Sequence, residues 1–468
     1  MKNTKYKVNS WVITAVVIVA IILVNLIVSA VDSKFPLKID MTKDKIYEMT
    51  DETKTAMKEL NTPVNAYVLC TESEAPTLIK EYINRYKSLT DKVKFEYIDI
   101  YKNQTMLMKY QQSGEAVTAG DIILECGERH KIISVSGVKN EVTTMGSEKL
   151  YSFDLESKLT NGITYVAGLV SEDKIYFLKG HGETQSKGFE SAISDLNHVS
   201  ETISIASADS QIPEDASMVV AFMPNADFSE EECQKIDSYL DKGGKFVAVY
   251  NPGLVSCPRF EAYLTEWGIT PVHNLVCEND TTKMVKSPVI FRPELKDHDI
   301  TKNLINMDLQ VLYYGSISFD TNSDNQQKAT VTSLAQTSDK AVGKANINAT
   351  SAEYEEGDTR GSFDVCVLSE KDVTVNGETK KASVMAIGSM AVTDYTDERA
   401  NVEFVKNTIN YMTENTSNVS ITSKIITEGL FTQPSVLVQA ILYYLLVWII
   451  PIGLLIAGIV IWLRRRYL

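Results

Sequence analysis

Apolar positions along this chain follow two spacings that alternate with each other. In short stretches such as 64–69 (VNAYVL), apolar residues occupy every second position or run together, which predicts β-strands. In the stretches between them, residues such as Ile79, Tyr82 and Tyr86 recur at the spacing of one helix face. Strands and helices that follow one another in this way predict an α/β fold.

Residues 32–145 are expected to form a thioredoxin-like α/β unit. A helix capped by Thr50 and stopped by Pro63 precedes strands and helices in the order strand, helix, strand, helix, hairpin. These elements are predicted at 64–69, around Ile79, at 92–100, at 105–112 and within 121–135, where Gly127 separates two strands. The first strand leads into Cys70-Thr-Glu-Ser73, which lacks a second cysteine, so we do not expect thiol–disulfide exchange.

Residues 146–418 are expected to form a larger α/β domain of the flavodoxin or amidotransferase type. Its strands, predicted at 174–178, 217–224, 245–253 and 383–389, are almost continuously apolar. This pattern predicts a parallel sheet covered by helices on both faces. One of these helices begins with a capping box of Ser229 and Glu232. The stretch 320–381 is polar and predicts an insertion of loops and exposed strands.

Two uncharged apolar stretches, 11–31 and 436–463, predict transmembrane helices that flank the α/β region. Each is long enough to cross a hydrocarbon core of ~30 Å. The tail 1–10 carries lysines and the tail 464–468 carries Arg464-Arg-Arg466, which predicts that both termini are cytoplasmic. The fold class is thus a membrane-anchored α/β protein of the plasma membrane, with the lipid bilayer as a partner. Residues 32–435, including a connector at 419–435, are expected outside the cytoplasm.

A cleaved signal peptide ending near Val28-Ser-Ala30 is the alternative for the first stretch. The apolar run is longer than the ~7–15 residues of such peptides, which favours an uncleaved anchor.

Composition and net charge exclude some classes of function. The 468 residues are 44% hydrophobic and 23% charged, and a net charge of −15 argues against a nucleic-acid partner, whose phosphates need a basic face. Six cysteines, with no C-x-x-C pair among them, predict small buried residues or occasional disulfides and no zinc knuckle. We therefore expect no metal and no cofactor.

One short loop is a candidate site: Gly180, His181, Gly182 and Glu183, between a predicted strand and helix. In an open parallel sheet, ligands bind beyond the carboxyl ends of the strands, so the position permits catalysis or an anion site. The other histidines are spread singly, no cysteine lies in a Gly-x-Cys-x-Gly elbow, and no phosphate-loop motif occurs. The favoured interpretation is a tight glycine turn whose histidine bonds a neighbouring loop.

The chain resembles the GldG family of gliding-motility-type auxiliary proteins of bacterial ABC transport systems. Four stretches carry the resemblance, in the order of that family: KIYEMTDETKTAMKELNTPV, KIYFLKGHGE, FSEEECQKIDSYLDKGGKFVAVYNPG and IPIGLLIAGIVIWLRRR. The resemblance implies that an extracytoplasmic α/β region works with a separate permease and a cytoplasmic ABC ATPase. It supplies no catalytic residues, and the stretch 320–381 has little to match.

These observations predict a non-enzymatic auxiliary or scaffold subunit of an ABC transport system. The alternatives are a membrane-tethered module that binds or senses a solute, and an enzyme related to hydrolases or amidotransferases that uses His181 and Glu183.

Overall fold

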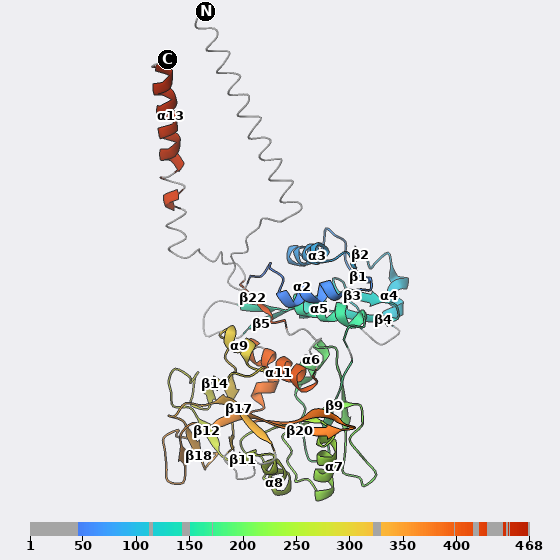
Figure 1. Ribbon diagram of the computed structural model, residues 1–468, viewed down its shortest axis with the longest axis vertical. Helices are drawn as coiled ribbons and strands as arrows, with labels where there is room; N and C mark the ends of the chain where they lie inside the picture. Colours follow the sequence, from blue (N-terminus) through green and yellow to red (C-terminus); the bar gives the residue numbers. More distant parts are fainter. Residues whose placement is uncertain are drawn as a thin grey trace, which may run out of the picture. The chain divides into compact units, whose positions relative to one another are not determined.

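The computed structural model describes residues 45–111, 116–142, 150–170, 172–321, 329–396, 398–414, 421–427, 443–445, 448 and 450–466. Contacts divide the chain into two units, one being Tyr47–Ile426 and the other Met1–Ile46 with Thr427–Leu468. The α/β part of the predicted fold class is confirmed, and both sheets discussed below lie in the unit Tyr47–Ile426 (Figure 1).

The first part of this unit is built on a four-stranded sheet of order β2-β1-β3-β4. Strand β1 is parallel to β2 and antiparallel to β3, and β4 returns antiparallel to β3. The Thr50 side chain accepts a hydrogen bond from the Thr53 amide and so starts the first helix, as predicted. The elements are α2 Asp51–Glu59, β1 Val64–Val68, α3 Thr77–Leu89, β2 Val93–Tyr97, α4 Gln104–Gln111, β3 Ile122–Cys126, β4 Arg129–Ile133, η1 Val135–Gly137, β5 Lys139–Val142, β6 Leu150–Phe153 and α5 Leu155–Val166.

Among the described residues, the second part contains a ten-stranded sheet and two small sheets, and its last strand joins two strands of the first part in a third small sheet. Its elements are β7 Lys174–Leu178, α6 Lys187–Asp195, β8 Val199–Ile203, β9 Ala216–Phe222, α7 Glu230–Leu240, β10 Lys245–Val249, α8 Pro258–Glu266, β11 Thr270–Val272, β12 Leu275–Cys277, β13 Ile290–Phe291, β14 Glu294–Leu295, α9 Lys302–Asn306, β15 Tyr313–Tyr314, β16 Ser318–Asp320, β17 Thr330–Gln336, β18 Val342–Lys344, β19 Thr359–Arg360, β20 Asp364–Val375, β21 Glu378–Ile387, α10 Ala391–Asp394, α11 Arg399–Met412 and β22 Lys424–Thr427.

The ten-stranded sheet is mixed, although the apolar strands predict a parallel one. Strands β8, β7, β9, β10 and β21 are mutually parallel neighbours. Strand β20 then runs antiparallel to β21, and β16 and β17 run antiparallel to β20. Helix α6 links β7 to β8 and α7 links β9 to β10, because a parallel crossover needs a long connection, whereas the antiparallel pair β20–β21 needs only a turn.

The polar stretch 320–381 is part of this sheet and not only an insertion of loops and exposed strands. Residues 365–368 of β20 are fully buried. A two-residue turn at Asn376 and Gly377, with φ of 54° and 84°, joins β20 to β21. Such left-handed pairs favour Asn-Gly because both residues tolerate a positive φ.

Helices cover both faces of the parallel strands (Figure 1). Alternate residues of β7, β9 and β10 point to opposite faces, as the pleat requires. Phe177, Val220 and Val247 pack with residues of α6 and α11, and Tyr176, Val219 and Phe246 pack with residues of α7 and α8. The parallel strands are therefore buried on both faces, which leaves their two ends and the loops there as places for a site.

The prediction of two transmembrane helices is wrong. Across the ranges that the structure describes, no helix combines the length and the apolar character needed to span a bilayer. The first predicted span, 11–31, lies outside the described residues. Within the second, helix α13 is Ile450–Arg466, which has 17 residues and ends in three arginines.

We expect Gly188→Ala to destabilise the fold although alanine favours helices. Gly188 lies in α6, where a Cβ atom would come 2.3 Å from the Thr393 carbonyl oxygen. Helix propensity alone would stabilise the variant by about 1 kcal/mol, whereas overpacking costs about 1–3 kcal/mol. Thermal unfolding should therefore show a lower midpoint. Gly137→Ala is the control, because a Cβ atom there meets no atom within 4 Å. Equal or higher midpoints for Gly188→Ala would contradict the close contact.

Candidate functional site

The loop Gly180–Glu183 lies at the point where the chain reverses its direction across the sheet. The chain runs from β7 outward to β8 and then crosses to β9 on the other side of β7. The carboxyl ends of β7 and β9 therefore flank a topological switch point, where open α/β sheets bind ligands. The predicted loop follows β7 directly.

Backbone contacts hold this loop against the end of β9. The Asn225 amide donates to the His181 carbonyl oxygen at 2.7 Å, and the Thr184 amide donates to the Phe222 carbonyl oxygen at 3.1 Å. Gly182 has φ of +77°, and a Cβ atom there would lie 3.3 Å from Cβ of Asn225. The turn thus needs glycine both for its left-handed backbone and for the close approach.

The His181 side chain fills the space between the loop and α7. Its Nδ1 is 3.1 Å from Oε1 of Glu183, and its Nε2 is 3.0 Å from Oε1 of Glu232. The imidazole stacks on Phe228 with 3.9 Å between ring centroids. Only 7% of the side chain is exposed, so both ring nitrogens face carboxylates in a buried setting.

The two carboxylate oxygens of Glu232 contact different partners. Its Oε2 accepts hydrogen bonds from the amide and the hydroxyl of Ser229, both at 2.8 Å, which confirms the predicted capping box. Its other oxygen, Oε1, faces His181. The histidine therefore links the turn after β7 to the first turn of α7.

The carboxylates change the protonation of the histidine. The hydrogen bond to Glu183 raises the pKa of His181, against burial, and the charge of Glu232 raises it further. Burial acts to raise the pKa of Glu183, but the hydrogen bond from His181 lowers it overall. The cluster thus favours an imidazolium ion that is hydrogen-bonded to Glu183 and lies at ion-pair distance from Glu232.

The first residue after β9 is Met223, with φ of +48°. A nucleophile elbow places its reactive side chain on such a strained residue at a strand end. A thioether carries no ionisable hydrogen and is only a weak acceptor. The strained residue at the end of β9 is therefore no nucleophile.

The six cysteines are free thiols rather than disulfides. Cys70 and Cys126 are half-buried, and the other four are buried. Burial raises the pKa of both Cys233 and Cys257 to about 11, so these thiols stay protonated near neutral pH. Within the described ranges, no group of three or more His, Cys, Asp or Glu side chains is arranged to hold a metal ion.

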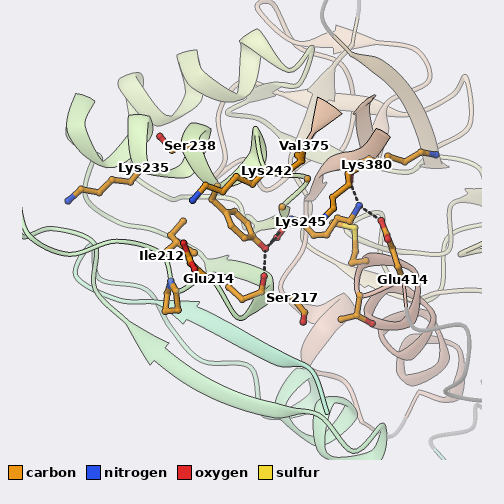
Figure 2. Close-up of a pocket in the computed structure, with 18 of the residues that line it drawn as sticks. Ile212, Glu214, Ser217, Lys235, Ser238, Lys242, Lys245, Val375, Lys380 and Glu414 are labelled. Atoms are coloured by element: carbon orange, nitrogen blue, oxygen red, sulfur yellow. Dashed lines mark hydrogen bonds and ion pairs between the residues drawn. The ribbon is translucent and has the colours of Figure 1, made fainter. Parts of the chain in front are cut away.

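A cavity of about 830 Å³ lies at the opposite end of the parallel strands, beside their amino ends (Figure 2). We call this end of the strands the amino edge of the sheet. Its walls come from the loop 211–217 before β9, the end of α7, the start of β10, the β20–β21 hairpin and the end of α11. Five lysines contribute to the lining: Lys235, Lys242, Lys245, Lys380 and Lys381. None of the residues of the predicted loop Gly180–Glu183 takes part in it.

Lys245 is the buried lysine of this cavity, with 5% of the residue exposed. Its ammonium group is 2.7 Å from Oε1 of Glu414 and also donates to the Lys381 carbonyl oxygen (Figure 2). The Lys245 amide donates to the hydroxyl of Tyr239 at 3.1 Å. The start of β10 is thus fixed to both α7 and the hairpin.

The sequence interpretation missed this cavity, although two signals for it exist. The stretches DKGGK (241–245) and ETKK (378–381) each place lysines beside a turn. They are more than 130 residues apart, and the parallel pairing of β10 with β21 brings them together. A lysine beside a turn is common on solvated surfaces, so neither stretch alone indicates a cavity.

A second cavity of about 420 Å³ lies at the carboxyl ends of β10 and β21. Asn251 and Met390 line it from these two strand ends, and Tyr314 and Asp394 line it from neighbouring segments. This cavity lies at the carboxyl ends of the strands, where open α/β sheets bind ligands, but it is not at the switch point beside His181.

Solved structures show only weak likeness to the chain. The N-terminal domain of mmIFT52 is 14% identical, with a match covering 52% of this chain and 99% of that one at a TM-score of 0.37. A putative ThuA-like protein from Bacteroides uniformis ATCC 8492 is 14% identical, covering 53% and 94%, with a TM-score of 0.30. PurLQS from Thermotoga maritima is 10% identical, covering 52% and 100%, with a TM-score of 0.29. Scores this low support no argument about fold or function.

Family comparisons are more informative. No curated protein matches the chain. Residues 43–136 match a domain of unknown function, DUF7088. Residues 172–408, which include the parallel strands, His181 and most of the cavity lining, match a family over just over half of the 468 residues. The chain belongs to this family, which is described as an ABC-type uncharacterized transport system.

Proposed function

We propose that this chain is a non-enzymatic auxiliary subunit of an ABC transport system, of the GldG type. Its α/β unit would contact the permease, or the transported substance, on the extracytoplasmic side. Family membership supports a role in an ABC transport system. The observation that carries the non-enzymatic role is the buried His181, both of whose ring nitrogens are engaged by the chain's own carboxylates.

The engaged histidine is poorly suited to general acid–base catalysis. A general base must accept a proton from a substrate within hydrogen-bond reach, which requires a free ring nitrogen. In this cluster Glu183 and Glu232 occupy both nitrogens, and Phe228 covers one face of the ring. A structural role explains all of these contacts, because the imidazole joins two loops at the sheet edge.

The chain also lacks the phosphate-loop motif G-x-x-x-x-G-K-[ST]. An ABC system needs an ATPase, so the proposal requires a separate ATPase subunit and a separate permease as partners. A role in binding a solute is the second candidate, and the lysine-lined cavity of about 830 Å³ is the observation that favours it.

We expect the tagged full chain, isolated from native membranes in mild detergent, to bring an ABC ATPase and a permease with it. Mass spectrometry should find both in near-stoichiometric yield. The same procedure on cells with the untagged chain controls for non-specific capture. Recovery of the chain alone over several detergents would overturn the proposed partnership.

The structural role of His181 makes a pH-dependent prediction. The pKa of His181 is raised above its unfolded value of ~6.5. Its contribution to stability is therefore fully present below pH ~6.5 and is lost as pH rises through the folded pKa. The pKa values of Glu183 and Glu232 are lowered, so the contribution of these carboxylates to stability is fully present above their unfolded value of ~4.3 and is lost as pH falls through their folded pKa values.

We expect His181→Gln to lower the free energy of unfolding by about 1–3 kcal/mol near pH 6, because one buried carboxylate loses its donor. The difference from the unsubstituted chain should shrink at pH 8.5, as measured by urea unfolding. His273→Gln is the control, since His273 also pairs with a glutamate but is 36% exposed. Unchanged stability at both pH values would contradict the structural role and favour a catalytic histidine.

A further inference from the structure

The cavity at the amino edge of the sheet is locally basic in an acidic chain. The chain has a net charge of −15, yet five lysines line the cavity against three carboxylates, those of Glu214, Asp372 and Glu414. An acidic protein repels anions at long range, so a local excess of positive charge must be built if an anion is to bind. The contacts of each lysine determine which charges are available.

Two of the five lysines are committed to the fold. The Lys235 ammonium donates to the carbonyl oxygens of Ile205 at 2.8 Å and Ser207 at 2.6 Å, which fixes the chain after β8. The Lys381 ammonium is 3.3 Å from Glu370, its neighbour across the β20–β21 pair. The Lys381 charge is thus offset by a carboxylate outside the lining. Lys235 contacts neutral carbonyl oxygens and keeps its charge, so four lysine charges face the three carboxylates of the lining.

Lys245 retains one donor for a ligand. An ammonium group has three N–H donors. Glu414 and the Lys381 carbonyl oxygen account for two of them among the described residues. The side chain of Lys245 is only 6% exposed, whereas that of Glu414 is 66% exposed, so the lysine is a fixed group at the cavity wall and its partner reaches out to solvent.

Lys242 and Lys380 add two charges beside it. In the part of the chain that the structure describes, neither ammonium group has a hydrogen bond or an ion pair. Their segments touch, because a Cβ atom on Gly243 would lie 2.8 Å from Cβ of Lys380. The close approach of this glycine turn to the hairpin brings both lysines to the same cavity as Lys245.

The size and the remaining lining fit a small organic molecule. Ligand sites of proteins measure about 300–1,000 Å³ and combine apolar walls with a few polar groups. This cavity measures about 830 Å³, and Ile212, Val375 and Met412 supply apolar surface (Figure 2). Ile212 and Lys242 are drawn on the same side of it, away from Glu414 (Figure 2).

We propose that this cavity binds a small organic anion with at least two negative charges, through Lys242, Lys245 and Lys380. The charged groups of the ligand are carboxylates or phosphates. The oxygens of both groups can accept hydrogen bonds from ammonium groups, so the lysines do not distinguish between them. The proposal goes beyond the transport role, since it concerns binding by the chain itself and holds whichever partners the chain has.

The test is isothermal titration calorimetry on the purified full chain with citrate, inorganic phosphate and pyrophosphate, each at matched ionic strength. We expect saturable binding of at least one probe, and the probe that binds identifies the charged group as carboxylate or phosphate. Lys242→Met combined with Lys380→Met should weaken that binding about tenfold or more, because two charges near the anion are lost. Raising the salt concentration from about 50 to 300 mM should also weaken it.

Lys87→Met combined with Lys94→Met is the matched control. It removes the same charge from exposed positions on α3 and β2, which do not line the cavity. This control should bind the anion like the unsubstituted chain, and both double variants should keep the thermal unfolding midpoint. If the cavity variant unfolds early, Lys242→Met alone replaces it, since Lys242 is exposed at a turn. Absence of saturable binding for all three probes, or equal weakening in both double variants, would overturn the proposal.

Discussion

The carboxylate of Glu156 joins the first and last elements of the unit Tyr47–Ile426. Its Oε1 accepts from the Thr50 amide at 2.7 Å and the Thr53 hydroxyl at 2.8 Å, and its Oε2 pairs with Lys424 at 2.6 Å. The side chain of Glu156 is 3% exposed. Removal of one partner of such a buried pair is costly because the other charge stays desolvated. The start of α2, helix α5 and strand β22 are thus held together by one side chain.

A second buried charge network joins the four-stranded and ten-stranded parts of this unit. Asp195 of α6 lies 3.2 Å from Lys158 of α5 and 2.9 Å from Lys406 of α11. Burial acts to raise the pKa of Asp195, but the two lysines lower it to about 2. These contacts and the apolar cores use the faces of the ten-stranded sheet on the α6 and α11 side. Both described cavities accordingly lie at strand ends.

Local sequence signals predict much of this fold, and long-range pairing explains what they miss. Thr50, the Ser229–Glu232 capping box and strand β7 could be located because each depends on residues close in sequence. The partner of His181 could not, since Glu232 follows it by about fifty residues and serves also as a cap. The central place of β20 was missed as well, although Asn376-Gly377 is a strong hairpin signal. The polar average over 320–381 concealed the continuously buried stretch 365–368 of β20.

The long β20–β21 hairpin explains how a cavity can form at the amino ends of the parallel strands while the hydrophobic core stays packed. Residues 383–387 of β21 are buried and pair with β10, whereas its first residues, 378–381, are exposed and extend past the start of β10. Lys380 and Lys381 of this extension line the cavity together with Val375 of β20. Because the extension contributes few buried residues, its length and charge can change while the parallel sheet remains packed. The size and charge of the cavity are therefore largely independent of the contacts around His181, which lies at the carboxyl ends of the parallel strands.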